Sequence, residues 1–149
     1  MDIKDSVNNA LSELTSGGLF DLIQIDYDEK NFGNICILLK SSKNLEIKFI
    51  KDKGVFWCEI GQAGDWFFIE DVFNAIEHPM GYSIEYPIEY NGEGFIDYLN
   101  EISSLLTQNL QLIFHIFNST ESEKIQNRIK EFAKKRAIEM FKCKRNNKT

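Results

Sequence analysis

Few residues of this chain are of the types that carry out catalysis, and they lie far apart in the sequence. They are two histidines and three cysteines: His78, His115, Cys36, Cys58 and Cys143. His115 stands in the apolar run LIFHIF, which predicts a buried or half-buried structural histidine. His78 precedes Pro79, where a helix is expected to end and where a histidine interacts favourably with the helix dipole. There is no Cys-x-x-Cys and no His-x-x-x-His pair, so the sequence predicts no zinc site and no other metal site.

Carboxylates are abundant, with 23 Asp and Glu against 17 Lys and Arg, and paired carboxylates can do general acid–base work. The adjacent pair Glu70 and Asp71 falls in a predicted helix, where neighbouring side chains diverge by about 100° and do not face one substrate. The glycine motifs at 61–64 and 92–94 have no lysine after them, and no Gly-x-Ser-x-Gly elbow occurs. We therefore expect no enzymatic activity and no cofactor, and keep a small carboxylate-dependent enzyme as an alternative.

Four strand-like runs joined by short links predict the sheet that positions these residues. The runs span residues 19–27, 33–40, 45–50 and 55–60. The links at 41–44 and 52–54 are too short for a parallel crossover, so the strands should form an antiparallel meander. The run ICILL, residues 35–39, lacks alternation and predicts a strand covered on both faces.

Helical periodicity surrounds this sheet. It predicts one helix before the strands and further helices after them, at residues 2–14, 69–76, 95–117 with a bend near 108–109, and from about 120. The expected fold class is α+β: an antiparallel β-meander of about four strands, preceded by one helix and packed by two to three C-terminal helices. We expect a single domain over residues 1–149, with a polar tail that frays from about residue 143.

The ends and the cysteines indicate a compartment. The first residues have neither a positively charged nor an apolar signal-peptide region, and no apolar run is long enough to span a bilayer. Three widely spaced cysteines argue against a disulfide framework. These features predict a cytoplasmic protein that does not contact a membrane.

Charge is distributed unevenly along the chain. Residues 1–53 carry 7 basic and 9 acidic side chains, residues 54–123 carry 12 acidic and no basic ones, and residues 124–149 carry 10 basic and 2 acidic ones. The middle segment predicts a negative field over part of the surface. The basic last segment lacks interleaved aromatic residues, so we expect a solvated helix face that partly neutralises the acidic segment, and no direct binding of nucleic acid.

Both tryptophans lie in the stretch KFIKDKGVFWCEIGQAGDWFFIEDVFNAIEH, residues 48–78. Trp57 and Trp66 have two interpretations: packing in the core or at its rim, or an exposed anchor for a partner. We expect packing, with residues 52–54 as a hairpin tip and residues 69–76 as a helix against the sheet. If the ring of Trp57 is fully buried, its truncation to alanine should cost about 3–5 kcal/mol of stability.

The order of motifs in residues 48–76 resembles a known class of proteins. A charged hairpin FIKDKG, a strand VFWCEIG and a run WFFIEDVF that opens a helix are similar to cytosolic immunity proteins of bacterial polymorphic toxin systems, including those of contact-dependent growth inhibition. The resemblance implies a protein that binds the toxic C-terminal domain of a delivered effector, often a nuclease, and blocks its active site. It implies no catalytic residues, and the motif residues would mark the fold more than the binding surface: Gly54, Trp57, Glu59, Trp66, Glu70, Asp71 and Val72.

The charge pattern independently predicts a basic partner. A nuclease domain holds phosphates in a basic cleft, and an inhibitor of that cleft should present carboxylates and aromatic side chains. The expected toxin-binding surface is a Tyr- and Glu-rich segment with two possible extensions: Glu85, Tyr86, Glu89, Tyr90, Glu93 and Asp97, extended by Asp65 and Glu77. The alternative is an acidic adaptor or scaffold subunit that binds a basic protein other than a toxin. The sequence leaves the identity of the toxin and the oligomeric state open.

Overall fold

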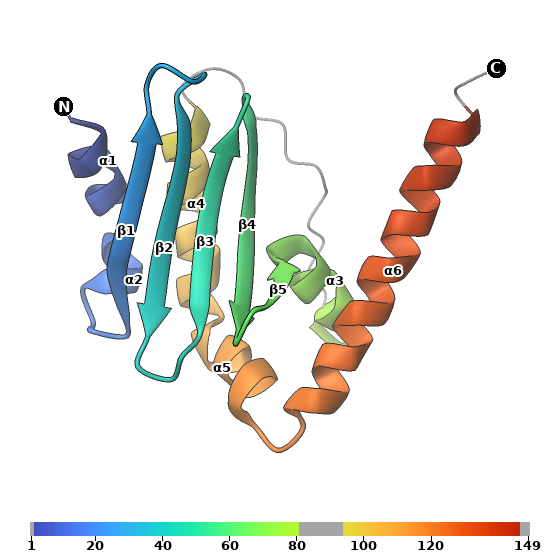
Figure 1. Cartoon of the computed structure of the whole chain (residues 1–149). Coiled ribbons are helices and arrows are strands. Elements are labelled where there is room, and N and C mark those ends of the chain that lie inside the picture. Colours follow the sequence, from blue (N-terminus) through green and yellow to red (C-terminus); the bar gives the residue numbers. More distant parts are fainter. Residues whose placement is uncertain (1, 81–93, 147–149) are drawn as a thin grey trace.

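The computed structural model describes the backbone of residues 2–80 and 94–146, and the side chains of residues 2–75 and 94–139. Its elements in chain order are α1 (Ile3–Ala10), α2 (Ser12–Thr15), β1 (Phe20–Asp28), β2 (Asn34–Ser41), β3 (Glu46–Asp52), β4 (Val55–Gln62), β5 (Asp65–Phe68), α3 (Ile69–Met80), α4 (Gly94–Gln108), α5 (Leu110–Asn118) and α6 (Ser122–Asn146). In Figure 1 the strands lie side by side, α1, α2, α4 and α5 lie behind them, and α3 and α6 lie beyond β5.

The sheet is an antiparallel meander in the order β1-β2-β3-β4-β5. The predicted α+β class and the meander are confirmed, but the sheet has five strands where the sequence predicted about four. The added strand is β5, which pairs with the end of β4 over four residues, from Glu59 opposite Phe68 to Gln62 opposite Asp65. The sequence pattern left residues 66–68 open as an extended segment or a helix start, since so short a strand carries little periodicity of its own.

A two-residue turn sets the register between β3 and β4. Asp52 pairs with Val55, so Lys53 and Gly54 are the central residues of the turn. Both have positive φ, 50° at Lys53 and 81° at Gly54. Positive φ at both positions is the geometry of a type I′ turn, whose twist matches that of the flanking strands. The predicted hairpin tip at residues 52–54 is confirmed.

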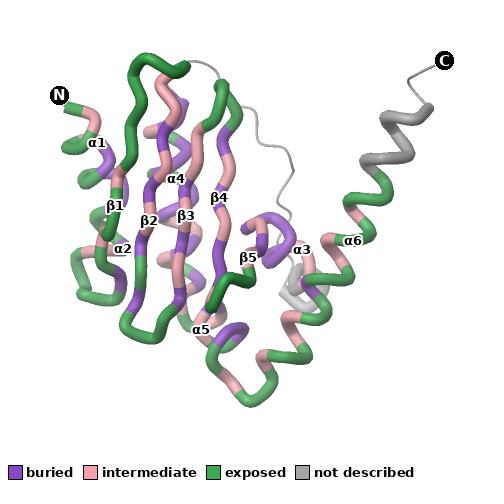
Figure 2. The backbone as a smooth tube through the Cα atoms, viewed as in Figure 1, coloured by how far each residue is buried: buried purple, intermediate pink, exposed green. Residues whose placement is uncertain are grey.

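One face of the sheet forms the core. Its buried residues alternate along the strands: Ile35, Ile37, Leu39, Leu45, Ile47, Phe49, Phe56, Cys58 and Ile60. Figure 2 shows this alternation as purple segments between pink ones on β2, β3 and β4. Helix α4 packs on this face, where the ring of Phe95 meets that of Phe56 edge-on at 5.3 Å. Full burial of each such aliphatic or aromatic side chain contributes about 1.5–3 kcal/mol, so this layer holds α4 and the sheet together.

The opposite face has no described helix over β1–β4 (Figure 1). The prediction that residues 35–39 are covered on both faces is therefore wrong for the described part of the chain. Ile37 and Leu39 are buried, whereas Cys36 and Leu38 are half-buried on the other side of the strand. The reason is topological: a meander of hairpins has no crossover helices between its strands, so a second helical layer is not built automatically.

The predicted long helix from 95 to 117 is two helices, α4 and α5, and the break lies at Asn109, where the sequence predicted a bend. The side-chain Nδ2 of Asn109 donates to the carbonyl oxygen of Leu105 at 2.8 Å. Such a local bond competes with the backbone ladder and favours a helix end. Helix α6 runs through Asn146, past residue 143 where a frayed tail was expected. Among the described helices, none combines the length and the apolar character that crossing a membrane requires.

Candidate functional site

The sheet face opposite the helices is the candidate site, and we call it the open face. The strand register assigns its side chains: Asp21, Gln24, Asp26 and Asp28 on β1; Asn34, Cys36, Leu38 and Lys40 on β2; Glu46, Lys48, Ile50 and Asp52 on β3; Val55, Trp57 and Glu59 on β4; Trp66 and Phe68 on β5. It carries six carboxylates and two lysines, a net charge of −4. Leu38, Ile50 and Trp57 on β2, β3 and β4 are half-buried between these charges. Apolar side chains grouped among charges are typical of a protein interface.

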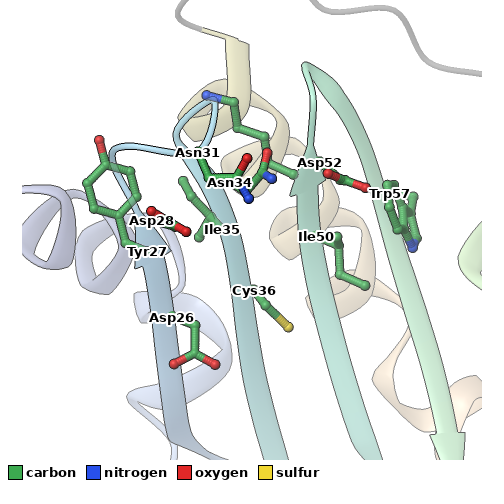
Figure 3. A pocket seen from close by; sticks show the side chains of 11 residues that line it. Asp26, Tyr27, Asp28, Asn31, Asn34, Ile35, Cys36, Ile50, Asp52 and Trp57 are labelled. Carbon is green, nitrogen blue, oxygen red and sulfur yellow. The ribbon is translucent and has the colours of Figure 1, made fainter.

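A groove lies at one end of the open face, between the β1–β2 and β3–β4 turns, and we call it the hairpin groove. Its volume is about 560 Å³. Its floor follows one row of the register across four strands: Asp26, Cys36, Ile50 and Trp57. The small Cys36 lies inside this row and Trp57 stands at its end, which leaves a hollow. In Figure 3, Asp26, Tyr27 and Asp28 lie on one side of it and Asp52 and Trp57 on the other.

The hairpin groove is rich in carboxylates. Among the described residues, Asp26, Asp28 and Asp52 form no ion pair, and Asp26 Oδ2 accepts a hydrogen bond from Gln24 Nε2 at 2.6 Å. Lys51 also lines the groove, and its Nζ lies close to Gly33 in the β1–β2 turn. One lysine against three carboxylates leaves the groove negative.

The middle of the floor of the hairpin groove, at Cys36 and Ile50, is neutral. Burial raises the pKa of the Cys36 thiol above its ordinary value of 9.0, Lys48 lowers it, and Asp26 and Glu59 raise it further. The thiol therefore stays protonated at neutral pH and behaves as a small apolar group beside Ile50.

Two aromatic rings of the open face make cation–π contacts with basic side chains of the same chain. Lys48 Nζ lies 4.0 Å from the centre of the Trp66 ring, and the Arg136 guanidinium lies 5.3 Å from the centre of the Phe68 ring. Both distances lie within the roughly 6 Å over which a ring face attracts a cation. No lysine or arginine of the described residues lies over Trp57.

The tryptophans lie on the open face, not in the core. Trp57 and Trp66 are half-buried, and their neighbours Phe56 and Phe67 are buried on the other side of the same strands. The expected hairpin tip and the helix that begins at Ile69 are confirmed, and of the two expected kinds of packing the half-buried ring of Trp57 fits the rim and not the core. Alternation along β4 puts Val55, Trp57 and Glu59 together, as the sequence predicted, and the side on which the helices pack decides which set is buried.

Most of the predicted toxin-binding residues fall outside the described part of the chain: Glu85, Tyr86, Glu89, Tyr90 and Glu93. Glu77 lies in α3, but its side chain is not described either. Asp97 is exposed in the first turn of α4, and Asp65 is exposed at the start of β5. These two residues lie at different ends of β4. Asp97 follows Phe95, whose ring contacts Phe56 at the start of β4, whereas Asp65 pairs with Gln62 at its end, roughly 20 Å away along the strand.

Among the described side chains, His115, Cys36 and Cys58 form no site of their own, and the side chains of His78 and Cys143 lie outside the described residues. His115 is exposed, with 51% of its side chain accessible, and its Nε2 lies 3.6 Å from Glu121 Oε2. The prediction of a buried or half-buried His115 is wrong because the buried side of α5 is formed by Ile113, Ile116 and Phe117. Across the described residues, no three His, Cys, Asp or Glu side chains gather as a metal ion would require.

A buried carboxylate pair joins α3 to α6. Glu70 and Asp71 are each 1% exposed. Asp71 accepts two hydrogen bonds from Arg136, from Nε at 2.6 Å and from Nη2 at 2.9 Å, so the pair is bidentate. Glu70 diverges from Asp71, as predicted, and its Oε2 has no hydrogen-bond partner among the described residues. This arrangement stabilises the fold at the β5 edge and does not present two carboxylates to one substrate.

Glu70 makes stability depend on pH. Burial raises its pKa from 4.5 to about 7, its own backbone hydrogen bond lowers it, Asp71 raises it and Arg136 lowers it. The folded state therefore keeps a proton that the unfolded state releases, so stability should fall as pH rises from about 4.5 to 7 and stay low above that. A shift of this size corresponds to about 3 kcal/mol.

We expect Glu70→Gln to remove this penalty, with almost no gain in stability at pH 4.5 and up to about 3 kcal/mol at pH 8. Urea unfolding of both proteins across this pH range measures the difference. Glu131→Gln, an exposed change on α6 with the same charge effect, is the control. A constant gain for Glu70→Gln at all pH values would show that Glu70 does not titrate in this window.

Comparison of the chain with protein-family models, with curated proteins and with solved structures finds no match. The resemblance to immunity proteins therefore rests on the sequence pattern of residues 48–76 alone.

Sequence analysis missed the residues of the hairpin groove. Asp26, Asp28 and Asp52 come from the segment 1–53, whose net charge is small. A signal was nevertheless present on β3, where Ile50 is in phase with Glu46 and Lys48 and so places an apolar residue on the polar side of the strand. A single apolar residue on a polar face is common, and it is the pairing of Ile50 with Trp57 on the next strand that makes an apolar group typical of an interface.

Proposed function

We propose that this chain is a cytoplasmic immunity protein that binds a cognate toxin domain, most simply a nuclease, and covers its basic active-site cleft. The observation that supports this proposal is the open face, with four more carboxylates than lysines around a half-buried tryptophan. In this proposal the protein needs no cofactor and contacts neither nucleic acid nor a membrane. The predicted segment from Glu85 to Asp97 is a second contact.

The chemistry of the open face suits a basic protein partner. Carboxylates pair with Arg and Lys, and Trp supplies rigid contact area that is enriched among the residues dominating binding energy. A negative surface also accelerates encounter with a positive one, to rates on the order of 10⁸–10⁹ M⁻¹s⁻¹ at low salt. A high association rate is useful to an inhibitor that must bind a nuclease before the nuclease cuts nucleic acid. The same charges would repel the phosphates of a nucleic acid.

An acidic adaptor that binds a basic protein other than a toxin would use the same face, so binding alone does not separate the two functions. Protection does. A polymorphic toxin is encoded beside its immunity gene, and the C-terminal domain of the neighbouring effector is the partner to test. An adaptor would leave cells that make this domain unprotected, whereas an immunity protein would restore their growth.

Reversing charge on the open face should remove this protection. We expect the triple change of Asp26, Asp28 and Asp52 to Lys to lower the association rate at low salt by roughly tenfold or more, because steering depends on the summed charge. Surface plasmon resonance at two salt concentrations measures the rate, and growth of toxin-producing cells measures protection. The matched control reverses the same number of exposed carboxylates away from the face: Glu13, Glu131 and Glu139.

The triple change of Glu85, Glu89 and Glu93 to Lys alters net charge by the same amount and tests the second contact. Two results together would place the interface on the segment before α4. The open-face variant would keep full protection and an unchanged association rate, and the variant at Glu85, Glu89 and Glu93 would lose protection and associate more slowly. Circular dichroism of each variant confirms that it folds.

A further inference from the structure

We propose that the hairpin groove holds an arginine side chain of the basic partner, with its guanidinium plane against Trp57, its N–H groups directed at Asp52, and the carboxylates of Asp26 and Asp28 across the groove adding attraction. This inference rests on the proposed function for the nature of the partner and adds the chemical group that is recognised. In this inference, the groove at one end of the open face binds a single arginine of the partner, and the rest of the face makes the surrounding contacts.

The groove is a shallow hollow that a single side chain can enter. Its volume of about 560 Å³ falls in the roughly 300–1,000 Å³ range of small-molecule sites. Its floor at Cys36 and Ile50 is apolar and neutral, and can contact the methylene stem of a long side chain. The carboxylates stand at the sides, where the polar end of such a side chain would reach them.

The charges around the groove are unbalanced. Asp26 and Asp28 from β1 face Asp52 from β3, and none of them is paired with a cation among the described residues. Lys51 offsets one of these charges and is held beside the β1–β2 turn. A cation from a partner would therefore complete the groove, while an anion would meet net repulsion.

The aromatic residues of the open face point to the same ligand by a separate observation. Lys48 lies over the ring of Trp66 and Arg136 lies over the ring of Phe68, so two of the three aromatic rings of this face already have a cation over them. Trp57 is the third ring and borders the groove, and no described cation lies over it. A cation over Trp57 would repeat the arrangement that the chain itself makes twice on this face.

Arginine fits the groove better than lysine or a metal ion. A guanidinium is planar, stacks on an indole and offers a fork of donors to a carboxylate beside the ring, here Asp52, whereas an ammonium is a strongly hydrated point charge. The carboxylates lie on opposite sides of the groove, and the described residues provide no cluster of three ligands for a metal. Arginine is also common where nuclease domains hold phosphate.

The test uses small probes, so it does not require the toxin. In a Trp66→Phe background Trp57 is the single tryptophan, and its fluorescence and its indole NMR resonance report on the groove. The probes are end-blocked Gly-Arg-Gly, Gly-Lys-Gly and Gly-citrulline-Gly tripeptides. We expect a saturable response to the arginine peptide at millimolar concentration, a severalfold weaker response to lysine and none to citrulline, the neutral isostere.

A pair of variants with equal charge change separates the groove from general electrostatics. Asp26→Asn with Asp52→Asn should weaken the arginine response by about tenfold, because both removed charges face the ligand. Glu13→Gln with Glu131→Gln removes the same charge on α2 and α6 and should leave it unchanged. Equal responses to arginine and citrulline, or equal weakening by both pairs of changes, would overturn the inference.

The outcomes also separate this inference from the proposed function. If Trp57 responds to arginine but the chain does not protect toxin-producing cells, the groove stands and the immunity function fails. If the chain protects and Trp57 does not respond to arginine, the function stands and the toxin is held by other parts of the surface.

Discussion

Replacing Arg136 by methionine should lower the free energy of unfolding by about 3–5 kcal/mol, the largest loss of stability that we expect from any single charged residue of this chain. The change removes a bidentate partner at 2.6 and 2.9 Å from Asp71, whose side chain is 1% exposed, and leaves a buried carboxylate without that cation. It also removes a charge that lowers the pKa of Glu70. Urea unfolding at pH 7 measures the loss.

The neighbouring residue provides a matched control. Lys135→Met removes the same charge from the same helix at an exposed position, and we expect a change within about 0.5 kcal/mol. Changing Asp71 to Leu together with Arg136 to Met should recover much of the loss, because a buried ion pair can be replaced by apolar contact with little cost. Equal effects of Arg136→Met and Lys135→Met would mean that the pair between α3 and α6 does not hold these helices together.

Trp57→Ala should separate binding from stability. If the open face is the interface, we expect the affinity for the toxin domain to fall by about 30- to 1,000-fold, or roughly 2–4 kcal/mol, because a tryptophan buried by a partner commonly dominates binding energy. The loss of stability should stay below the about 3–5 kcal/mol of a core aromatic, because the ring of Trp57 is only half-buried. Calorimetric titration with the toxin domain and urea unfolding measure the two quantities on one sample.

Phe56 is the control for this prediction, since it precedes Trp57 on β4 and points to the opposite face. It is 7% exposed and packs on Phe95 and Tyr98, so Phe56→Ala should cost about 3–5 kcal/mol of stability. If Trp57→Ala destabilises the protein as much as Phe56→Ala and leaves the affinity of the folded fraction unchanged, Trp57 is a packing residue, as the sequence first suggested.

The two proposals place different demands on the open face. Immunity requires only that the face cover the partner's active site, and many weak contacts around Trp57 would suffice. An arginine anchor requires that Asp52 act with Trp57 as one group, so their effects on binding should not be additive. A double-mutant cycle between Asp52→Asn and Trp57→Ala against the toxin domain would measure this coupling.

Local chemistry determined much of the fold in advance. The alternation of Val55, Trp57 and Glu59 against Phe56, Cys58 and Ile60 follows from the two-residue period of a strand. The turn at Lys53 and Gly54 and the break at Asn109 depend on backbone preferences of single residues and their immediate neighbours. Such features are set within a few residues, so a sequence pattern is sufficient to find them.

The side on which the helices pack depends on contacts between distant residues, and no local pattern contains it. Phe95 on Phe56 and Arg136 on Asp71 are such contacts, and they decide that Trp57 faces outward and that Asp71 is buried. The charge of the open face illustrates the same limit. Counted along the chain, residues 1–53 have a net charge of only −2, because their lysines and carboxylates are mixed.

The register sorts those charges by direction. Most carboxylates of β1 and β3 point to the open face, whereas only two lysines do so and the others lie on helices, turns or the far end of the core side. The sequence by itself therefore determined four of the strands and the turns between them, and a basic partner is what it predicts. Only the tertiary structure decided where the negative surface lies, because a surface is formed by residues adjacent in space and a window of sequence averages over both faces of each strand.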